Sequence, residues 1–197
     1  IEGRSVKKYI EDIFSGNILR RTLGIATLNA LSSYCWKKGI KTDYEIIKSR
    51  DAFDDLIFKD GEKTVVIGAL VPVLKTLIAG NHDFKVLEMD SKTLKGKELD
   101  HFAPSNEYPK YVPEADHLVI TGVTILNDTL YDILDKAKAG ADILVTGPTA
   151  SMLPDAFFDK GVTTMGGIIV TNANECLEII AEAGSGYHFF GKSAERL

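Results

Sequence analysis

Hydrophobic positions from residue 62 onward follow two spacings in turn. Short apolar, β-branched runs predict buried strands, and between them apolar residues recur every three or four positions, as in amphipathic helices. The predicted strands are Thr64–Leu70, Phe84–Met89, His117–Thr121, Asp142–Thr146, one within Thr163–Val170, and His188–Phe190. The predicted helices are Pro72–Ala79, Asp128–Ala139, Ser151–Lys160 and Ala173–Ala183, and residues 90–115 read as loops. This alternation predicts an α/β fold with a parallel sheet and helices on both faces.

Residues 1–61 carry helical spacing without strands. Helices are predicted over Val6–Phe14 and Ile18–Lys38, and the second is apolar around much of its circumference. Such a helix usually packs between two bodies, so we expect it to lie between an N-terminal layer and the rest of the chain. Residues 40–61 are charged, with short helices predicted at Tyr44–Lys48 and Phe53–Phe58. We therefore divide the chain into a helical segment with its connector, 1–61, and a Rossmann-like α/β domain, 62–197.

Composition narrows the classes of partner. The net charge of −5 offers no basic surface for a nucleic acid. No stretch approaches the roughly 18 consecutive apolar residues of a membrane span, so no membrane partner is expected. Cys35 and Cys176 lie in apolar helical patterns and are interpreted as free thiols of a reducing cytoplasm, with a disulfide or metal pair as the alternative.

Ligands of open α/β sheets bind beyond the carboxyl ends of the strands, which makes four turns candidates for a site. The first contains Gly68, where a glycine allows close backbone approach before a helix, although the GxGxxG fingerprint is absent. The second contains Glu88, twenty residues later, which is predicted either to accept hydrogen bonds from ligand hydroxyls or to lie in a solvated loop.

The other two turns are rich in hydroxyl groups. Thr121-Gly122-Val123-Thr124 leads into Asn127 and Thr129, and Asn127 or Asp128 could equally cap the next helix. Gly147-Pro148-Thr149 follows the fourth predicted strand and offers backbone donors with little side-chain bulk.

Motifs of metal and nucleophilic chemistry are missing from the pattern. The four histidines are scattered, and no CxxC, HxxxH, GxSxG or Walker sequence occurs. Glu88, Asp90 and Asp128 could bind a hard cation, but no ligand spacing requires one. The sequence therefore leaves both cofactor and metal open.

Four stretches together resemble a known family, the "putative heavy-metal chelation" domain proteins. They are Leu23–Leu31, Val86–Glu88, Ile120–Leu130 and Val145–Thr149. The resemblance implies a Rossmann-like C-terminal domain, an N-terminal domain like the N-terminal part of enolase, and a site between them. It also implies condensation or hydrolysis of pterin-, flavin- or siderophore-like molecules. The enolase-like domain should begin with strands, whereas this sequence starts at helices, which makes Asn29 the main candidate from the N-terminal side.

Three functions follow as hypotheses. In the first, an enzyme acts on such a small molecule, with Glu88 and Asn127 as catalytic candidates. The ligand-binding candidates are Asn29, Gly68, Glu88, Thr121, Gly122, Thr124, Asn127, Thr129, Gly147, Pro148 and Thr149. The alternatives are a non-catalytic protein that binds a metal or a metal chelate, and a methyltransferase-like protein that uses S-adenosylmethionine. The broad apolar face of the second helix also makes a homodimer plausible.

Overall fold

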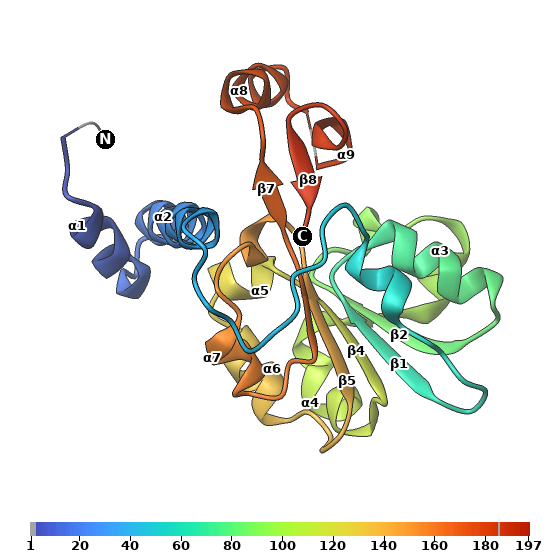
Figure 1. Cartoon of the computed structure of the whole chain (residues 1–197). Helices are drawn as coiled ribbons and strands as arrows, with labels where there is room; N and C mark the ends of the chain where they lie inside the picture. The colour runs from blue at the N-terminus through green and yellow to red at the C-terminus, as the bar shows by residue number, and fades with distance from the viewer. Residues whose placement is uncertain (1–2, 185) are drawn as a thin grey trace.

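The computed structural model describes residues 3–184 and 186–197, and its centre is a parallel sheet of six strands (Figure 1). The strands are β1 (Lys63–Ile67), β2 (Asp83–Glu88), β3 (Phe102–Pro104), β4 (His117–Thr121), β5 (Asp142–Thr146) and β6 (Thr164–Gly166). Their order in the sheet is β3-β2-β1-β4-β5-β6, so the winding direction reverses between β1 and β4. This reversal is the point where doubly wound sheets open a crevice for ligands.

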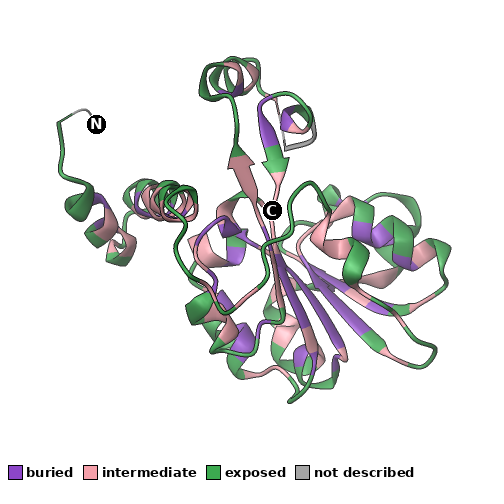
Figure 2. Ribbon diagram, viewed as in Figure 1, coloured by how far each residue is buried: buried purple, intermediate pink, exposed green. Residues whose placement is uncertain are grey.

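Helices cover both faces of the sheet, as the alternating pattern predicts. Val66 and Val119 face the helix α3 (Val71–Ala79), while their neighbours Val65 and Leu118 face the helix α6 (Leu130–Asp135). Because neighbouring strand residues point to opposite faces, both sets are buried, and Figure 2 shows the central strands buried along their length.

The segment 90–115 contains structure that the sequence pattern did not predict. Strand β3 pairs with β2 through Val86 and Phe102 and forms the edge of the sheet. It is only three residues long, too short to show a period among the prolines around it. Short turns of helix flank it, namely η3 (Ser91–Thr93), η4 (Gly96–His101), η5 (Ser105–Glu107), α4 (Tyr108–Tyr111) and η6 (Val112–Glu114).

The predicted strand within Thr163–Val170 is two strands that belong to different sheets. After β6, the chain passes Gly167 and enters β7 (Ile168–Val170), which pairs antiparallel with β8 (Ala194–Arg196). This pair, with α8 (Ala173–Ala181) and α9 (Gly186–Phe189), forms a small lobe above the carboxyl ends of the main strands (Figure 1).

The predicted strand His188–Phe190 is wrong, because residues up to Phe189 belong to α9. Its aromatic residues favour a strand by propensity, but Phe189 is buried against Cys176 and Ala194 in the small lobe. Tertiary packing therefore overrides the local preference at this position, and the last strand lies further along the chain.

Four predicted helices are shorter or absent, namely Asp128–Ala139, Ser151–Lys160, Tyr44–Lys48 and Phe53–Phe58. Asp128 adopts a positive φ of 66°, which separates α5 (Val123–Leu126) from α6. The helix predicted over Ser151–Lys160 is reduced to α7 (Asp155–Phe158), which follows Pro154 and is preceded by η7 (Pro148–Ala150). The connector forms no helix over Tyr44–Lys48 and only the short turn η2 (Ala52–Asp55).

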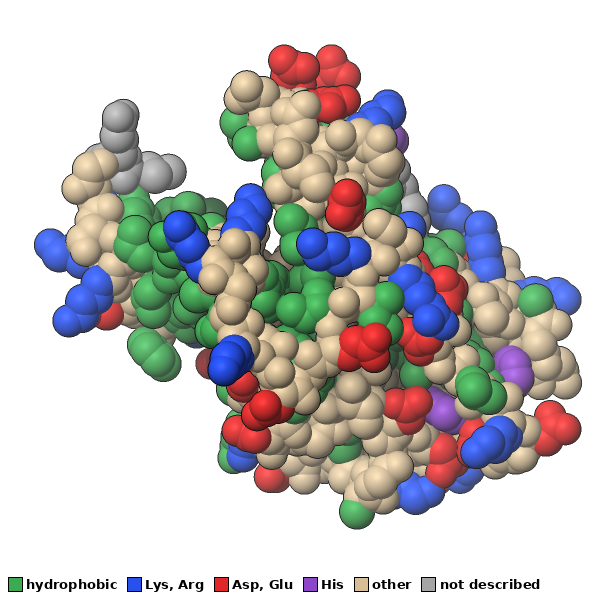
Figure 3. All heavy atoms as spheres, in the orientation of Figure 1, with side chains coloured by type: hydrophobic (Ala, Val, Ile, Leu, Met, Phe, Trp, Pro, Cys, Tyr) green, Lys and Arg blue, Asp and Glu red, His purple; other side chains and the backbone are tan. Residues whose placement is uncertain are grey.

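The N-terminal helices are α1 (Val6–Glu11), continued by η1 (Asp12–Phe14), and α2 (Ile18–Lys37). The second helix contacts α1 on one side and α5 and η7 on the other, which agrees with its expected place between two bodies. Its apolar surface is nevertheless only partly covered, since Leu19 is 72% exposed and Tyr34 58%. Figure 3 shows hydrophobic side chains gathered over α1 and α2. The homodimer stays a prediction that this surface motivates.

No helix in the described part of the chain combines the length and the apolar character needed to cross a membrane. Cys35 and Cys176 are both free thiols, as the sequence predicts.

Candidate functional site

A cleft of about 490 Å³ lies beyond the carboxyl ends of β5 and β6, between α3 and the small lobe. One wall comes from the turns after β1 and β5, and the other from the connector and the lobe. Its lining residues are Arg50, Asp51, Ala52, Phe53, Leu70, Pro72, Val73, Thr146, Gly147, Pro148, Gly166, Gly167, Ile168, Phe190, Arg196 and Leu197. The cleft therefore occupies the position where sheets of this winding hold their ligands.

Glycines leave the base of this cleft free of side chains. Gly147 has φ 129° and ψ 167°, a conformation that only glycine adopts without strain. A Cβ at Gly166 would stand 2.7 Å from Thr146 Oγ1 and 2.9 Å from the Cβ of Ala52. The close approach of Thr146 and Ala52 therefore requires glycine at position 166. Because this glycine has no side chain, the base of the cleft stays open there.

Three of the described lining residues have ionisable side chains, namely Arg50, Asp51 and Arg196. Arg196 Nε lies 3.4 Å from Asp51 Oδ2, and its guanidinium lies 4.0 Å from the ring centre of Phe190. Arg50 forms an ion pair with Asp55. Sequence reasoning missed both arginines, because neither follows one of the predicted main strands and no motif surrounds them.

The turns at Gly68 and Thr121 pack against each other where the winding reverses. Gly68 has φ 97°, and a Cβ there would meet Thr121 Cγ2 at 2.8 Å. The Thr124 hydroxyl donates to the Thr121 carbonyl at 2.7 Å, and the Gly122 N–H donates to the Thr146 carbonyl at 2.7 Å. These predicted site residues are brought together, but none of them lines the cleft, so their role in binding stays a prediction.

Glu88 and Asn127, the two catalytic candidates, both hydrogen-bond to nearby backbone. The Glu88 carboxylate accepts from the N–H groups of Ala69 at 2.9 Å and Met89 at 2.7 Å, which joins the end of β2 to the turn after β1. Asn127 Oδ1 accepts from the Thr129 N–H at 3.3 Å and from the Thr129 hydroxyl at 2.6 Å, within its own turn. Both contacts order a loop, and catalysis by either residue stays a prediction.

Asn29 connects α2 to the turn after β5. Its Nδ2 donates to the carbonyls of Pro148 and Thr149, both at 3.2 Å. Its Oδ1 is buried and has no hydrogen-bond partner among the described residues. Asn29 therefore holds the Gly147-Pro148-Thr149 turn, of which Gly147 and Pro148 line the cleft.

A second cavity of about 360 Å³ lies between the end of α2, the connector and β6. Its walls are mostly apolar, and the Trp36 indole N–H donates to the Tyr44 hydroxyl at 3.3 Å. Arg50, Ala52, Gly167 and Leu197 border both cavities. The connector thus runs between the two spaces.

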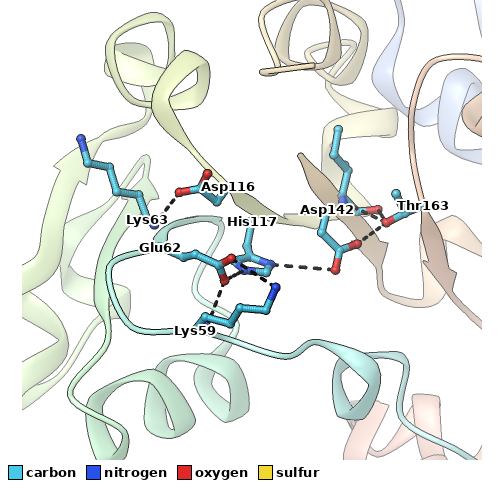
Figure 4. Close-up of polar contacts among 8 residues, drawn as sticks. Lys59, Glu62, Lys63, Asp116, His117, Asp142 and Thr163 are labelled. Carbon is cyan, nitrogen blue, oxygen red and sulfur yellow. Dashed lines mark hydrogen bonds and ion pairs between the residues drawn. The ribbon is translucent and has the colours of Figure 1, made fainter. Parts of the chain in front are cut away.

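A dense polar cluster surrounds His117 at the amino ends of the central strands, opposite the cleft (Figure 4). His117 Nε2 lies 2.7 Å from Glu62 Oε2, and Nδ1 lies 3.9 Å from Asp142 Oδ2. The hydrogen bond from His117, with a further one from the Lys59 backbone, lowers the pKa of the Glu62 carboxyl. The Lys138 ammonium and the Lys63 N–H lower the pKa of Asp116 in the same way.

The side chains of this cluster pair with one another, Glu62 and Asp142 with His117 and Asp116 with Lys138, and the cavity beside them measures about 370 Å³. Among the described residues, no group of three or more His, Cys, Asp or Glu side chains is placed to hold a metal ion.

Comparison with known proteins gives the relatives of the chain. A protein of Methanocaldococcus jannaschii, described as uncharacterised, is 31% identical over 194 residues, which are 96% of this chain and 70% of that protein. A crystal structure of a Pyrococcus horikoshii protein of unknown function matches all of this chain and 74% of its own, with a TM-score of 0.80 and 26% identity. One from Desulfitobacterium hafniense matches 99% of this chain and 74% of its own, with a TM-score of 0.73 and 20% identity.

Two family models match the chain, one over residues 51–197 and the other over residues 1–32. Both carry the same description, which is the family that the four sequence stretches resemble. The chain belongs to the "putative heavy-metal chelation" family.

Proposed function

We propose that this protein binds a small heteroaromatic or chelating molecule in the cleft and acts on it as an enzyme in a heavy-metal chelation context. The ligand class is pterin-, flavin- or siderophore-like, as the family resemblance implies. The observation that carries the proposal is the cleft of about 490 Å³ beyond the strand ends, where sheets of this winding hold ligands.

The lining of the cleft suits a flat molecule that is partly apolar. Phe53, Leu70 and Ile168 offer apolar contact, and Gly147 and Gly166 leave room for close approach to backbone. The turn at Gly147 is fixed from behind by Asn29, so the ligand would meet a preorganised wall.

The same lining favours a chelator or a chelated metal over a bare soft metal ion. Asp51 is its one side-chain carboxylate among the described residues, and neither an imidazole nor a thiol of those residues lines it. Soft and borderline metals prefer those missing donors. A non-catalytic role in binding a metal chelate is the second candidate, favoured by this shortage of acid and base groups within the cleft.

Calorimetric titration tests the binding proposal, with pterin, riboflavin, 2,3-dihydroxybenzoate and the iron(III) complex of 2,3-dihydroxybenzoate as probes. We expect at least one probe to bind, and we expect Leu70→Trp, which fills the cleft from a lining position, to weaken that binding at least tenfold. Leu177→Trp is the matched control, because Leu177 is 65% exposed on α8 and lies outside the lining. Equal binding by both variants would show that the ligand site lies elsewhere.

Turnover separates the two candidates. An enzyme would convert the bound probe. Glu88 does not line the cleft, so Glu88→Gln should leave the affinity within about twofold, and it would slow the conversion only if the ligand reaches the turn after β1 that Glu88 holds. Binding without conversion of any probe would favour the non-catalytic role.

A further inference from the structure

Arg196 is held at the wall of the cleft by contacts on three sides. Its backbone lies in β8 opposite Ile168, and its carbonyl accepts from the Ser49 N–H at 3.0 Å. Its guanidinium lies over the ring of Phe190, and Nε faces the Asp51 carboxylate. An arginine fixed in this way loses little further conformational freedom when it binds a ligand.

The guanidinium has donors to spare. An arginine carries five N–H donors in a planar fork, and within residues 3–184 and 186–197 its ion pair to Asp51 engages Nε. The side chain is 36% exposed and lines the cleft, so the Nη donors are open to a ligand.

The two guanidinium groups of the lining differ in how they are paired. Arg50 forms an ion pair with Asp55, whereas Arg196 meets the Asp51 carboxylate through Nε. Both cations carry the planar fork that matches a carboxylate through two parallel hydrogen bonds. The Asp51 carboxylate already occupies one side of Arg196, as a ligand carboxylate could occupy the other.

We propose that Arg196 anchors a carboxylate group of the ligand, with Phe190 and the apolar lining beside the ligand's ring. This inference rests on the proposed small-molecule function and deepens it, because it selects planar carboxylic acids within the ligand class.

Two matched pairs of probes test the inference by calorimetry: pterin-6-carboxylate against pterin, and 2,3-dihydroxybenzoate against catechol. In the wild type we expect the carboxylate to tighten binding about tenfold or more, the range of a charge-assisted bidentate contact. Arg196→Met keeps the side chain's stem over Phe190 and should abolish this preference. Lys192→Met is the control, since Lys192 is an exposed cation near the lobe that does not line the cleft, and it should retain the preference.

Asp51→Asn provides a test in the opposite direction. The amide keeps the Oδ1 acceptor that bonds the Phe53 N–H at 3.2 Å but removes the charge that competes for Arg196. We expect this variant to bind the carboxylated probes several-fold more tightly and their neutral partners unchanged.

The outcomes separate the two levels of the proposal. If both members of each pair bind the wild type equally, or if Arg196→Met keeps the preference, the carboxylate anchor is wrong while the small-molecule function stands. If no member of either pair binds, the carboxylate anchor falls, and the small-molecule function falls with it if riboflavin and the iron(III) complex of 2,3-dihydroxybenzoate also fail to bind.

Discussion

The two ends of the sheet's strands differ in how their polar groups are used. At the amino ends, Glu62 pairs with His117 and Asp116 with Lys138, so the charges satisfy one another. At the carboxyl ends, fewer charges surround a larger cleft, and Arg196 retains unused donors. A dense cluster of ionisable groups is therefore the weaker indication of a binding site here, and an open cleft with spare donors is the stronger one.

The largest effect is expected from His117→Ala at the amino ends. The His117 side chain is 8% exposed, hydrogen-bonds Glu62 and lies edge-on to the Phe58 ring, with centroids 5.1 Å apart. Loss of this packing and of a charge-assisted hydrogen bond should lower the free energy of unfolding by about 3 kcal/mol, measured by urea denaturation.

Probe binding at the cleft should be unchanged in the same variant, measured at a temperature where it is folded. A variant that keeps its stability but loses binding would reverse the roles assigned to the two ends.

Gly147→Ala should have the next largest effect. A Cβ at this position has open space, with the nearest atom at 3.7 Å, so the cost is the strain of φ 129°. We expect a loss of about 2 kcal/mol in thermal or chemical unfolding, together with weaker probe binding.

Gly140→Ala is its counterpart at the amino ends, where φ is 80° and a Cβ would meet nothing within 4 Å. This variant should cost about 1 kcal/mol and leave binding intact. If Gly147→Ala and Gly140→Ala weakened probe binding equally, the binding site would not be confined to the carboxyl ends of the strands.

Acid should loosen the amino ends of the strands. The pKa values of Glu62 and Asp116 are lowered in the folded protein by their hydrogen-bonded partners. A carboxyl group whose pKa is lower in the folded state stabilises the fold at any pH above its unfolded-state pKa. This stabilisation is lost as the pH falls through its folded-state pKa.

Stability measured by denaturation should therefore fall below about pH 4, the ordinary range of carboxyl groups. Glu62→Gln should make this acid-induced loss smaller. An unchanged pH profile in Glu62→Gln would show that the His117 contact does not hold the carboxyl in its charged form.

The smallest effect on stability is expected from Glu88→Gln. The amide oxygen can still accept from the Ala69 N–H, but the amide NH2 group replaces the oxygen that accepts from the exposed Met89 N–H, so unfolding should change by no more than about 1 kcal/mol. This variant is informative because its small effect on stability can be compared with its effect on turnover, which should fall if Glu88 is catalytic. A large loss of stability would show instead that the charge of Glu88 is mainly structural.

The parallel sheet with helices on both faces could be predicted from sequence because each main strand is buried on both faces and separated by helical spacing, whereas the strand order comes from the structure alone. Strand β3 could not, since three residues carry no period. The small lobe was misread because packing around Phe189 overrides its strand preference.

The turn at Gly147 and Pro148 was predicted from the rule of strand ends, and both residues line the cleft. Arg196 could not be predicted, because it reaches the cleft through the pairing of β7 with β8, which no local pattern encodes.

The most direct test of the difference between the two ends is to map backbone amide NMR shifts while titrating pterin-6-carboxylate. The largest shift changes should fall at Gly147, Gly166 and Gly167, which line the cleft. Little change is expected at Gly140 and His117, which lie at the amino ends of the strands. Changes concentrated at Gly140 and His117 would contradict the assignment of the binding site to the carboxyl ends of the strands.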